Sequence, residues 1–331
     1  MNRSSAYLLL AAIFLLALPY RSPAPLIFTP GEGWTYESVA AKGGWQRTRA
    51  KDQLDVAQQA FDNKDYGLTL KAARRVVTVW PLSDYAPAAE YLEGRYWEVK
   101  GVGEKAFKEY QKILAKYPKS TNYDEILTRE YDISMQYYNG KFFRTFFGLL
   151  PLYPSMDKTA GMFGQIVTNG PYSSIAPQAQ MMIGATREKQ RNYTAAADAY
   201  GLVADRYHDR PGMAADATYK QGLAYNKQAK TAEYDQGTAG QAISTFTDFI
   251  TLYPDDPRVP EAQKMIALLK TEQSHGNFTI AQFYEKSKRW KAALIYYNEV
   301  LVQDPNSPYA NPARERITIL KKRVQDEKTP G

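Results

Sequence analysis

Residues 289–313, RWKAALIYYNEVLVQDPNSPYANPA, contain one complete example of the unit that decides the fold. From Trp290 onward, apolar residues recur three and four positions apart, as they do on one face of an α-helix. The pattern stops at Asp304-Pro305, because proline cannot continue a helix, and Pro312 suits the first turn of the next one. The stretch therefore predicts a helix end, a short link and a second helix start.

The same unit occurs six times along the 331-residue chain. The blocks end at Pro81, Pro118, Pro171, His208, Pro254 and Pro305. Their eighth position holds Ala73, Tyr110, Phe163, Tyr200, Phe246 and Tyr297, on the apolar face. Successive block ends lie 37 to 53 residues apart, as expected for the 34-residue tetratricopeptide period with insertions. We therefore predict six helix pairs at about 48–80, 84–117, 121–170, 174–207, 212–253 and 258–304.

The predicted fold is all-α: a tetratricopeptide-repeat α-solenoid of about six helix pairs, with a C-terminal capping helix near 309–325. The solenoid would occupy residues 45–325, after a linker at 25–44 and before a tail at 326–331. Leading helices of such repeats line a concave surface. The polar, glycine-bearing stretch 226–240 predicts an exposed loop.

Proline and capping residues mark the predicted starts of the leading helices. Pro87, Pro177 and Pro260 fit a first helical turn, where the missing amide had no partner. Nearby pairs that could supply N-capping oxygens are Ser83-Asp84, Ser173-Ser174 and Asp255-Asp256.

The N-terminal residues 1–24 predict a signal peptide or an uncleaved N-terminal anchor. Arg3 precedes a 13-residue apolar run from Ala6 to Leu18, which suits a signal-peptide core and is short for a membrane span. Ser22-Pro23-Ala24 offers small residues for cleavage, whereas Pro25 is a poor residue just after such a site. We expect export, and both cleavage and retention of the run remain open.

Composition excludes several kinds of site. The chain has no cysteine, so disulfides, thiolate metal sites and a lipid on an N-terminal cysteine are excluded. A net charge of +7 without a run of five or more basic residues does not indicate nucleic-acid binding. The two histidines, His208 and His275, belong to distant repeats, and neither a catalytic triad motif nor a nucleotide-binding fingerprint occurs. We predict no metal, no cofactor and no enzymatic activity.

Two groups of side chains are candidates for binding a partner. The walls of the leading-helix groove would include Tyr91, Tyr96, Trp97, Tyr131, Tyr137 and Tyr138, with Arg95 and Arg129 placed to pair with a carboxylate. Packing between repeats is the alternative for each of them. The insertion 142–155 is rich in aromatic residues, including Phe142, Phe143, Phe146 and Phe147. It could fold back over the third pair, or form an apolar hook for a partner or a membrane surface.

The chain resembles the BamD family over residues 45–320, most strongly over 172–320, and four C-terminal motifs carry the resemblance. They are YPDDPRVPEA at 253–262, IAQFY at 280–284, WKAAL at 290–294 and DPNSP at 304–308. The resemblance implies a tetratricopeptide-repeat member of the outer-membrane β-barrel assembly machinery. By the same resemblance, the C-terminal repeats would dock the machinery and the N-terminal groove would receive unfolded barrel substrates. Family members carry a lipidated cysteine, and this chain has none.

The expected function is a non-enzymatic protein-binding scaffold of the cell envelope, BamD-like in outer-membrane β-barrel assembly. It would lie in the periplasm or on the periplasmic face of the outer membrane, held by its N-terminus or by partners. The alternative is a periplasmic or inner-membrane-anchored repeat adaptor that serves cell-wall synthesis or chaperoning.

Overall fold

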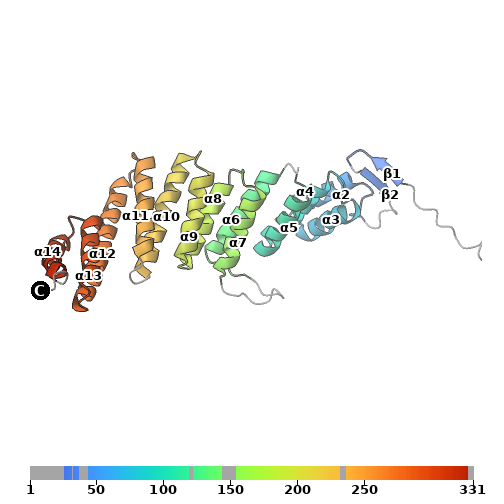
Figure 1. Cartoon of the computed structure of the whole chain (residues 1–331). Coiled ribbons are helices and arrows are strands. Elements are labelled where there is room, and N and C mark those ends of the chain that lie inside the picture. The colour runs from blue at the N-terminus through green and yellow to red at the C-terminus, as the bar shows by residue number, and fades with distance from the viewer. Residues whose placement is uncertain are drawn as a thin grey trace, which may run out of the picture. The chain divides into compact units, whose positions relative to one another are not determined.

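The computed structural model describes residues 26–31, 33–36, 44–118, 122–143, 154–231 and 236–326, coloured along the chain in Figure 1. These residues form thirteen helices and one two-stranded antiparallel hairpin. Among the helices described, none combines the length and the apolar composition that crossing a membrane requires. The chain divides into two compact units, residues 1–123 and 124–331.

Twelve of the described helices form six consecutive pairs, and the thirteenth follows them. The pairs are α2 (Ala50–Asp62) with α3 (Tyr66–Val79), α4 (Ala86–Val99) with α5 (Gly103–Lys116), α6 (Tyr123–Tyr138) with α7 (Met156–Asn169), α8 (Ala176–Lys189) with α9 (Tyr193–Arg206), α10 (Pro211–Thr231) with α11 (Gln236–Leu252), and α12 (Val259–Lys286) with α13 (Trp290–Gln303). Helix α14 (Ala310–Asp326) packs against α13. The predicted tetratricopeptide-repeat solenoid with a C-terminal helix is confirmed.

The same close contact recurs between the helices of three pairs. Tyr110, Tyr200 and Phe246, on α5, α9 and α11, are each at most 1% exposed. A Cβ atom added at Gly94, Gly184 or Gly222 of the leading helix would lie 2.3, 2.4 or 2.8 Å from the respective ring. Side-chain atoms do not approach so closely, so each ring fills space that only a glycine leaves open. Ala57 and Ala281 precede Ala73 and Tyr297 by the same 16 residues that separate Gly94 from Tyr110.

Hydrogen bonds from tyrosines join one repeat to the next. Tyr117, which follows α5, donates through its hydroxyl to the carbonyl of Pro81 at 3.0 Å. Tyr207, which follows α9, donates in the same way to the carbonyl of Pro171 at 3.2 Å. In both cases the partners lie 36 residues apart, so equivalent tyrosines fasten the end of a trailing helix to the turn of the preceding repeat.

The helix starts confirm one part of the sequence analysis and correct another. Pro87, Pro177 and Pro260 lie in the first turns of α4, α8 and α12, as predicted. The predicted N-capping side chains are absent from α4 and α8, whereas at the start of α12 the Asp256 carboxylate accepts from the amide of the N-cap residue Arg258 at 2.9 Å. A backbone turn precedes each of the three helices. In these turns the amides of Ala86, Ala176 and Val259 donate to the carbonyls of Ser83, Ser173 and Asp256, respectively.

The predicted exposed loop at 226–240 is also corrected. Helix α10 runs to Thr231 and α11 begins at Gln236, so most of this stretch extends the two helices. Asn226 is buried and its amide contacts the sulfur of Met265, while Ala239 is buried among apolar residues of α10, α11 and α12. Good helix formers such as Lys227, Gln228 and Ala229 allow α10 to continue despite the polar composition.

Two further elements complete the described layout. Helix α12 is continuous over 28 residues and is the longest of the described helices. Its first half packs on α11 and its second half on α13. Strands β1 (Leu26–Thr29) and β2 (Gly33–Tyr36) form a hairpin within the stretch 25–44 that was interpreted as a linker.

The contact between a glycine and an aromatic ring can be tested with two Gly→Ala variants. Gly184→Ala should lower the free energy of unfolding by about 1–3 kcal/mol, because the added methyl group collides with Tyr200 in a filled core. Gly161→Ala is the control, since an added Cβ at this exposed position of α7 meets nothing within 4 Å. Alanine there should be neutral or stabilise the helix by up to about 1 kcal/mol. Urea unfolding monitored by circular dichroism would measure the unfolding free energy of both variants. Equal changes for Gly184→Ala and Gly161→Ala would contradict a close contact between Gly184 and Tyr200.

Candidate functional site

The predicted groove residues are divided between two helices in separate units. Tyr91, Arg95, Tyr96 and Trp97 lie on α4, and Arg129, Tyr131, Tyr137 and Tyr138 lie on α6.

Arg95 on α4 lies among aromatic rings. Its guanidinium carbon is 5.3 Å from the centre of the Phe61 ring and 6.0 Å from that of Tyr91, and its Nε is 3.0 Å from a carboxylate oxygen of Glu98. Tyr91 in turn packs against Tyr110 of α5, with ring centres 5.9 Å apart. Cation–π contact and an ion pair hold this arginine in place, with 27% of its side chain exposed.

A cluster of half-buried aromatic side chains and exposed lysines, here named the α4 cluster, lies at the end of α4. It consists of Tyr66, Tyr96, Trp97, Lys100 and Lys105. Tyr96 meets Trp97 edge to face, with ring centres 4.8 Å apart. The Lys100 ammonium lies 5.7 Å from the Tyr66 ring centre, and that of Lys105 lies 4.2 Å from the Trp97 ring centre. Flat apolar surface beside positive charge is suited to an extended peptide with acidic or aromatic side chains.

The α6 residues take part mainly in packing within their own unit. Arg129 is bonded to Glu125 one turn earlier, at 2.9 Å, and the Tyr131 ring packs on Phe163 of α7 at 5.6 Å between centres. Burial raises the pKa of the Tyr131 hydroxyl. Tyr137 is only 2% exposed, so it cannot form a groove wall in this conformation.

Tyr138 binds a lysine of the neighbouring repeat. The Lys189 ammonium lies 3.6 Å from its ring centre and donates to the Tyr138 carbonyl at 2.7 Å. Burial is the main reason why the pKa of the Tyr138 hydroxyl is raised, and the nearby Glu188 charge adds to it.

The apolar insertion is partly described. Phe143 is 3% exposed and stacks on Tyr137 at 4.2 Å between ring centres, with the Lys158 ammonium 5.1 Å from its own ring centre. Phe142 is 52% exposed. Phe143 thus folds back onto the third pair, whereas Phe146 and Phe147 lie outside the described residues.

Two carboxylates link successive repeats, and the sequence analysis missed them. Glu188 accepts from the Tyr200 hydroxyl and from Lys227, each at 2.6 Å. Glu285 accepts from the Tyr297 hydroxyl at 2.8 Å and is paired with Arg316 of α14. Tyr200 and Tyr297 each follow their glutamate by 12 residues, and that repeated spacing was the available signal.

The motif around Asp256 forms a clamp between α10 and α12. Arg258 donates from Nε and Nη2 to the two carboxylate oxygens of Asp256 and from Nη1 to Asp216, at 2.8–2.9 Å. Its guanidinium lies 4.9 Å from the ring centre of Tyr219. The hydrogen bonds from Arg258 lower the pKa of Asp256 below its usual range. Burial, followed by a hydrogen bond to Glu261, raises the pKa of Tyr219 to about 12.

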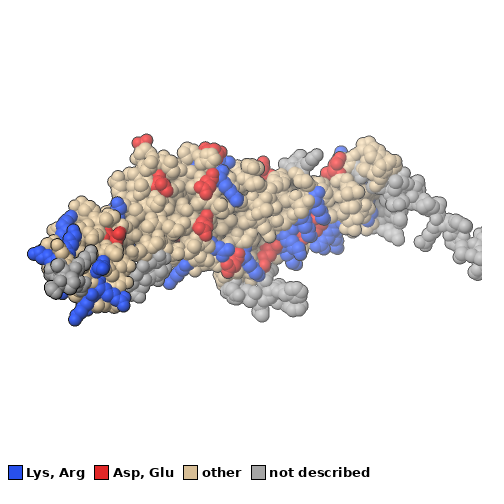
Figure 2. Space-filling model, in the orientation of Figure 1, with Lys and Arg blue, Asp and Glu red and all other residues tan. Residues whose placement is uncertain are grey.

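The C-terminal helices present a basic end, defined by seven exposed residues. Figure 2 shows lysine and arginine side chains gathered there. They are Lys286, Lys288, Arg289, Lys291, Lys321, Lys322 and Arg323. Beside them, α12, α13 and α14 enclose a groove of about 510 Å³, lined in part by Trp290, Arg316 and Arg323. The Arg323 guanidinium lies 5.0 Å from the Trp290 ring centre.

No group of three or more His, Asp or Glu side chains within the described ranges could hold a metal ion. His208 bonds the carbonyl of Asp205, and His275 stacks on Tyr309 with ring centres 4.8 Å apart.

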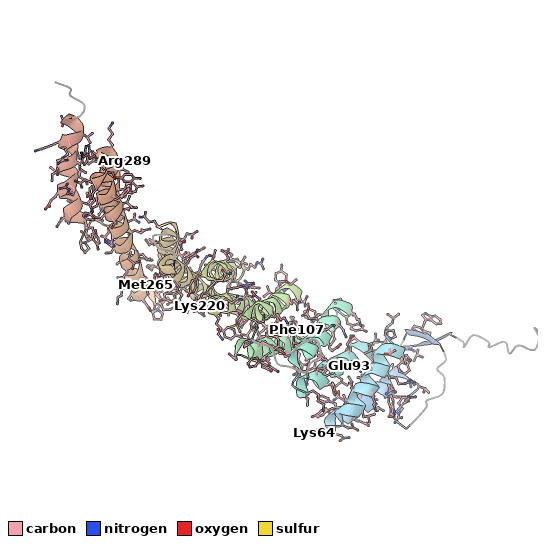
Figure 3. The ribbon with its side chains drawn as sticks, turned by 90° about the horizontal axis from the view of Figure 1, so that it is seen from below. Lys64, Glu93, Phe107, Lys220, Met265 and Arg289 are labelled. Carbon is pink, nitrogen blue, oxygen red and sulfur yellow. The ribbon has the colours of Figure 1, made fainter. Side chains whose placement is uncertain are left out.

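The clamp can be tested by replacing Arg258 with lysine. Arg258→Lys keeps the charge but loses the paired hydrogen bonds, so the C-terminal unit should lose about 1–3 kcal/mol of unfolding free energy. Arg289→Lys, at the exposed α12–α13 turn labelled in Figure 3, is the control and should change it by under about 0.5 kcal/mol. A shift in urea midpoint no larger than that of the control would show that the clamp contributes little.

Glu93, labelled in Figure 3, should make the N-terminal unit less stable as pH rises. Burial raises the pKa of this carboxyl above its ordinary 4.5, and the hydrogen bond from Arg74 only partly opposes that effect. Folding therefore favours the protonated form, and stability falls above pH 4.5 as the group ionises. Glu93→Gln should gain stability relative to the wild type as pH increases from 4.5 to 7, in midpoints followed by circular dichroism.

Asp55→Asn, an exposed position on α2, controls for the loss of one negative charge. If Glu93→Gln instead loses stability relative to wild type over that range, the ion pair with Arg74 outweighs the cost of burial.

Comparisons with known proteins agree with the C-terminal motifs. The YfiO family, described as "Outer membrane lipoprotein", matches residues 155–304. The outer membrane protein assembly factor BamD of Rickettsia prowazekii (strain Madrid E) is 26% identical over 144 residues. That match covers 44% of this chain, and the chain spans 57% of the length of that relative.

Solved structures of repeat proteins are also similar to this chain. A tetratricopeptide repeat protein from Parabacteroides merdae aligns with 11% identity and a TM-score of 0.33, covering 82% of this chain and 98% of the other. The C-terminal part of a repeat protein from Cytophaga hutchinsonii aligns with 16% identity and a TM-score of 0.36, covering 80% and 87%. Residues 155–304, less than half of the chain, are thus similar to the YfiO family and to BamD.

Proposed function

We propose that this chain is a non-enzymatic scaffold of the cell envelope, a BamD-like component in the assembly of outer-membrane β-barrel proteins. The observation that carries the proposal is the family match over residues 155–304. Its limits coincide with structural ones, since Ser155 caps α7 and Asp304 ends α13. The match therefore covers whole helices from α7 to α13.

The chemistry of the surfaces supports different binding partners for the two units. In the proposal, the groove beside the basic end binds a folded periplasmic domain of the assembly machinery. Trp290 would supply apolar area, and Arg323 would pair with an acidic group of that domain. The α4 cluster would receive extended segments of barrel substrates, which are rich in aromatic residues at the membrane girdles.

The proposal also places the chain on the periplasmic side of the envelope. The family description supports this location, although the sequence contains no cysteine that could carry a lipid. The second candidate, an inner-membrane-anchored adaptor for cell-wall synthesis or chaperoning, is favoured by the apolar run from Ala6 to Leu18. Recovery of the chain with cell-wall synthases in place of the barrel insertase would favour it.

The test is affinity purification of the full chain from detergent-solubilised envelopes of its own host. The wild type should retain the barrel-forming subunit of the assembly machinery, and Arg323→Glu should reduce that retention about tenfold or more, because it reverses a charge at the groove. Lys270→Glu, an exposed position elsewhere on α12, is the matched control and should retain the subunit as the wild type does. A wild-type preparation that contains no component of the machinery would contradict the proposal.

A further inference from the structure

The basic end is built from two segments that lie far apart in the sequence. Residues 286–291 form the turn from α12 to α13 and contain four basic residues, and residues 321–323 are three consecutive basic residues near the end of α14. The two segments meet, because the Arg323 guanidinium lies 5.0 Å from the centre of the Trp290 ring. Three helices thus bring seven exposed cations to one end of the C-terminal unit, as Figure 2 shows.

Acidic side chains compensate little of this charge. No aspartate or glutamate occurs in 286–291, or in 321–325, the last residues of α14 whose side chains are described. Glu285 borders the turn, but its carboxylate is bonded to Tyr297 and Arg316. Among the residues that the structure describes, no carboxylate forms an ion pair with any of the seven cations. The basic end therefore offers its positive charge to an external anion.

An exposed aromatic ring accompanies these charges. Phe283 lies three residues before Lys286 on α12, so the two side chains share one face of the helix. Phe283 is 64% exposed. An apolar ring flanked by cations suits the surface of an anionic bilayer, where the ring enters the boundary between headgroups and acyl chains while the cations stay among the phosphates.

The kinds of cation favour lipid over an acidic protein. Five of the seven are lysines, whose ammonium is a point charge without a preferred direction of approach. Arginine, with its paired donors, fits the fixed geometry of a protein carboxylate, as the contact between Arg258 and Asp256 illustrates. Lipid phosphates diffuse within the membrane plane, so they can meet separate lysines wherever these lie on the surface.

We propose that the basic end of the C-terminal unit binds the surface of a membrane that contains anionic phospholipids. The lysines of the α12–α13 turn and of α14 lie against headgroup phosphates, and the Phe283 ring enters the layer between them. Each basic residue close to such a surface raises the affinity about fivefold. Several together hold the C-terminal unit at the membrane without a lipid attached to the chain.

A polarity-sensitive dye at the basic end would report contact with lipid. The chain has no cysteine, so Ser287→Cys, at the exposed α12–α13 turn, creates a single labelling site in the full chain. Vesicles of phosphatidylglycerol mixed with phosphatidylcholine should shift the dye emission to the blue, and vesicles of pure phosphatidylcholine should not. The shift should disappear at about 1 M salt, where the Debye length falls to about 3 Å.

The matched control carries the same dye at Thr251→Cys. Thr251 is exposed in the last turn of α11, shortly before α12 begins, and α12 is about 40 Å long. This label should not respond to either kind of vesicle. Equal responses from the two labels, or an equal shift of the Ser287 label with pure phosphatidylcholine, would overturn the proposal. No shift with anionic vesicles would do the same, and would leave the basic end as a surface for protein alone.

Two Lys→Gly substitutions separate the effect of charge from that of stability. Lys288 has a φ of 54°, and Lys64, labelled in Figure 3, has a φ of 60° in the equivalent turn between α2 and α3. Glycine adopts this conformation readily, so both variants should leave the urea midpoint unchanged or raise it. In the chain labelled at residue 287, Lys288→Gly should nevertheless raise the lipid concentration for half of the dye shift about fivefold.

Lys64→Gly removes the same charge from the other unit and should leave that lipid concentration unchanged. Lys321→Gln combined with Lys322→Gln should raise it about 25-fold, because α14 supplies two of the contacting charges. A loss as large from Lys64→Gly as from Lys288→Gly would contradict a specific role for the basic end. None of these measurements involves the assembly machinery, so failure here is distinct from failure of the proposed function.

Discussion

In three of the six helix pairs, the packing depends on an aromatic ring of the trailing helix that lies directly over a glycine of the leading helix. At Gly94, Gly184 and Gly222 the backbone comes so near the ring that a single methyl group would overlap it. This close approach buries the rings of Tyr110, Tyr200 and Phe246 almost completely. Because the interior is close-packed, the two helices of such a pair fill the space between them at only one distance from each other. That distance in turn fixes how the helices stack.

Polar bonds then set the position of each pair relative to the next. Tyr200 and Tyr297 present their hydroxyls to Glu188 and Glu285, which also bind a cation of a following helix. Tyr117 and Tyr207 reach the preceding turn. Four of the 26 tyrosines thus combine a ring packed between helices with a directed hydrogen bond. The Arg258 clamp shows that the motif at 253–262 joins α12 to α10.

The sequence predicted the helix pairs well because their signal is periodic and local. Proline at a block end and apolar residues three and four positions apart both act within one pair. Helix α10 could not be delimited, since burial of Asn226 depends on Met265 in another repeat. The hairpin depends on a bond to Asp84, and Tyr137 is buried by Phe143. The candidate surface was predicted by residue type, but which of its rings face outward depends on such distant contacts.

The ring contacts can be observed directly in solution by proton NMR. A Cβ atom added at Gly94 or Gly184 would lie at similar distances from three successive ring atoms of Tyr110 or Tyr200, respectively. The position therefore lies over the face of the ring. A ring current shields a proton above the face. One α-proton of Gly94, Gly184 and Gly222 should therefore resonate well upfield of those of Gly161 and Gly212, where nothing lies within 4 Å. Ordinary shifts at all three glycines would contradict the packing on which the repeat depends.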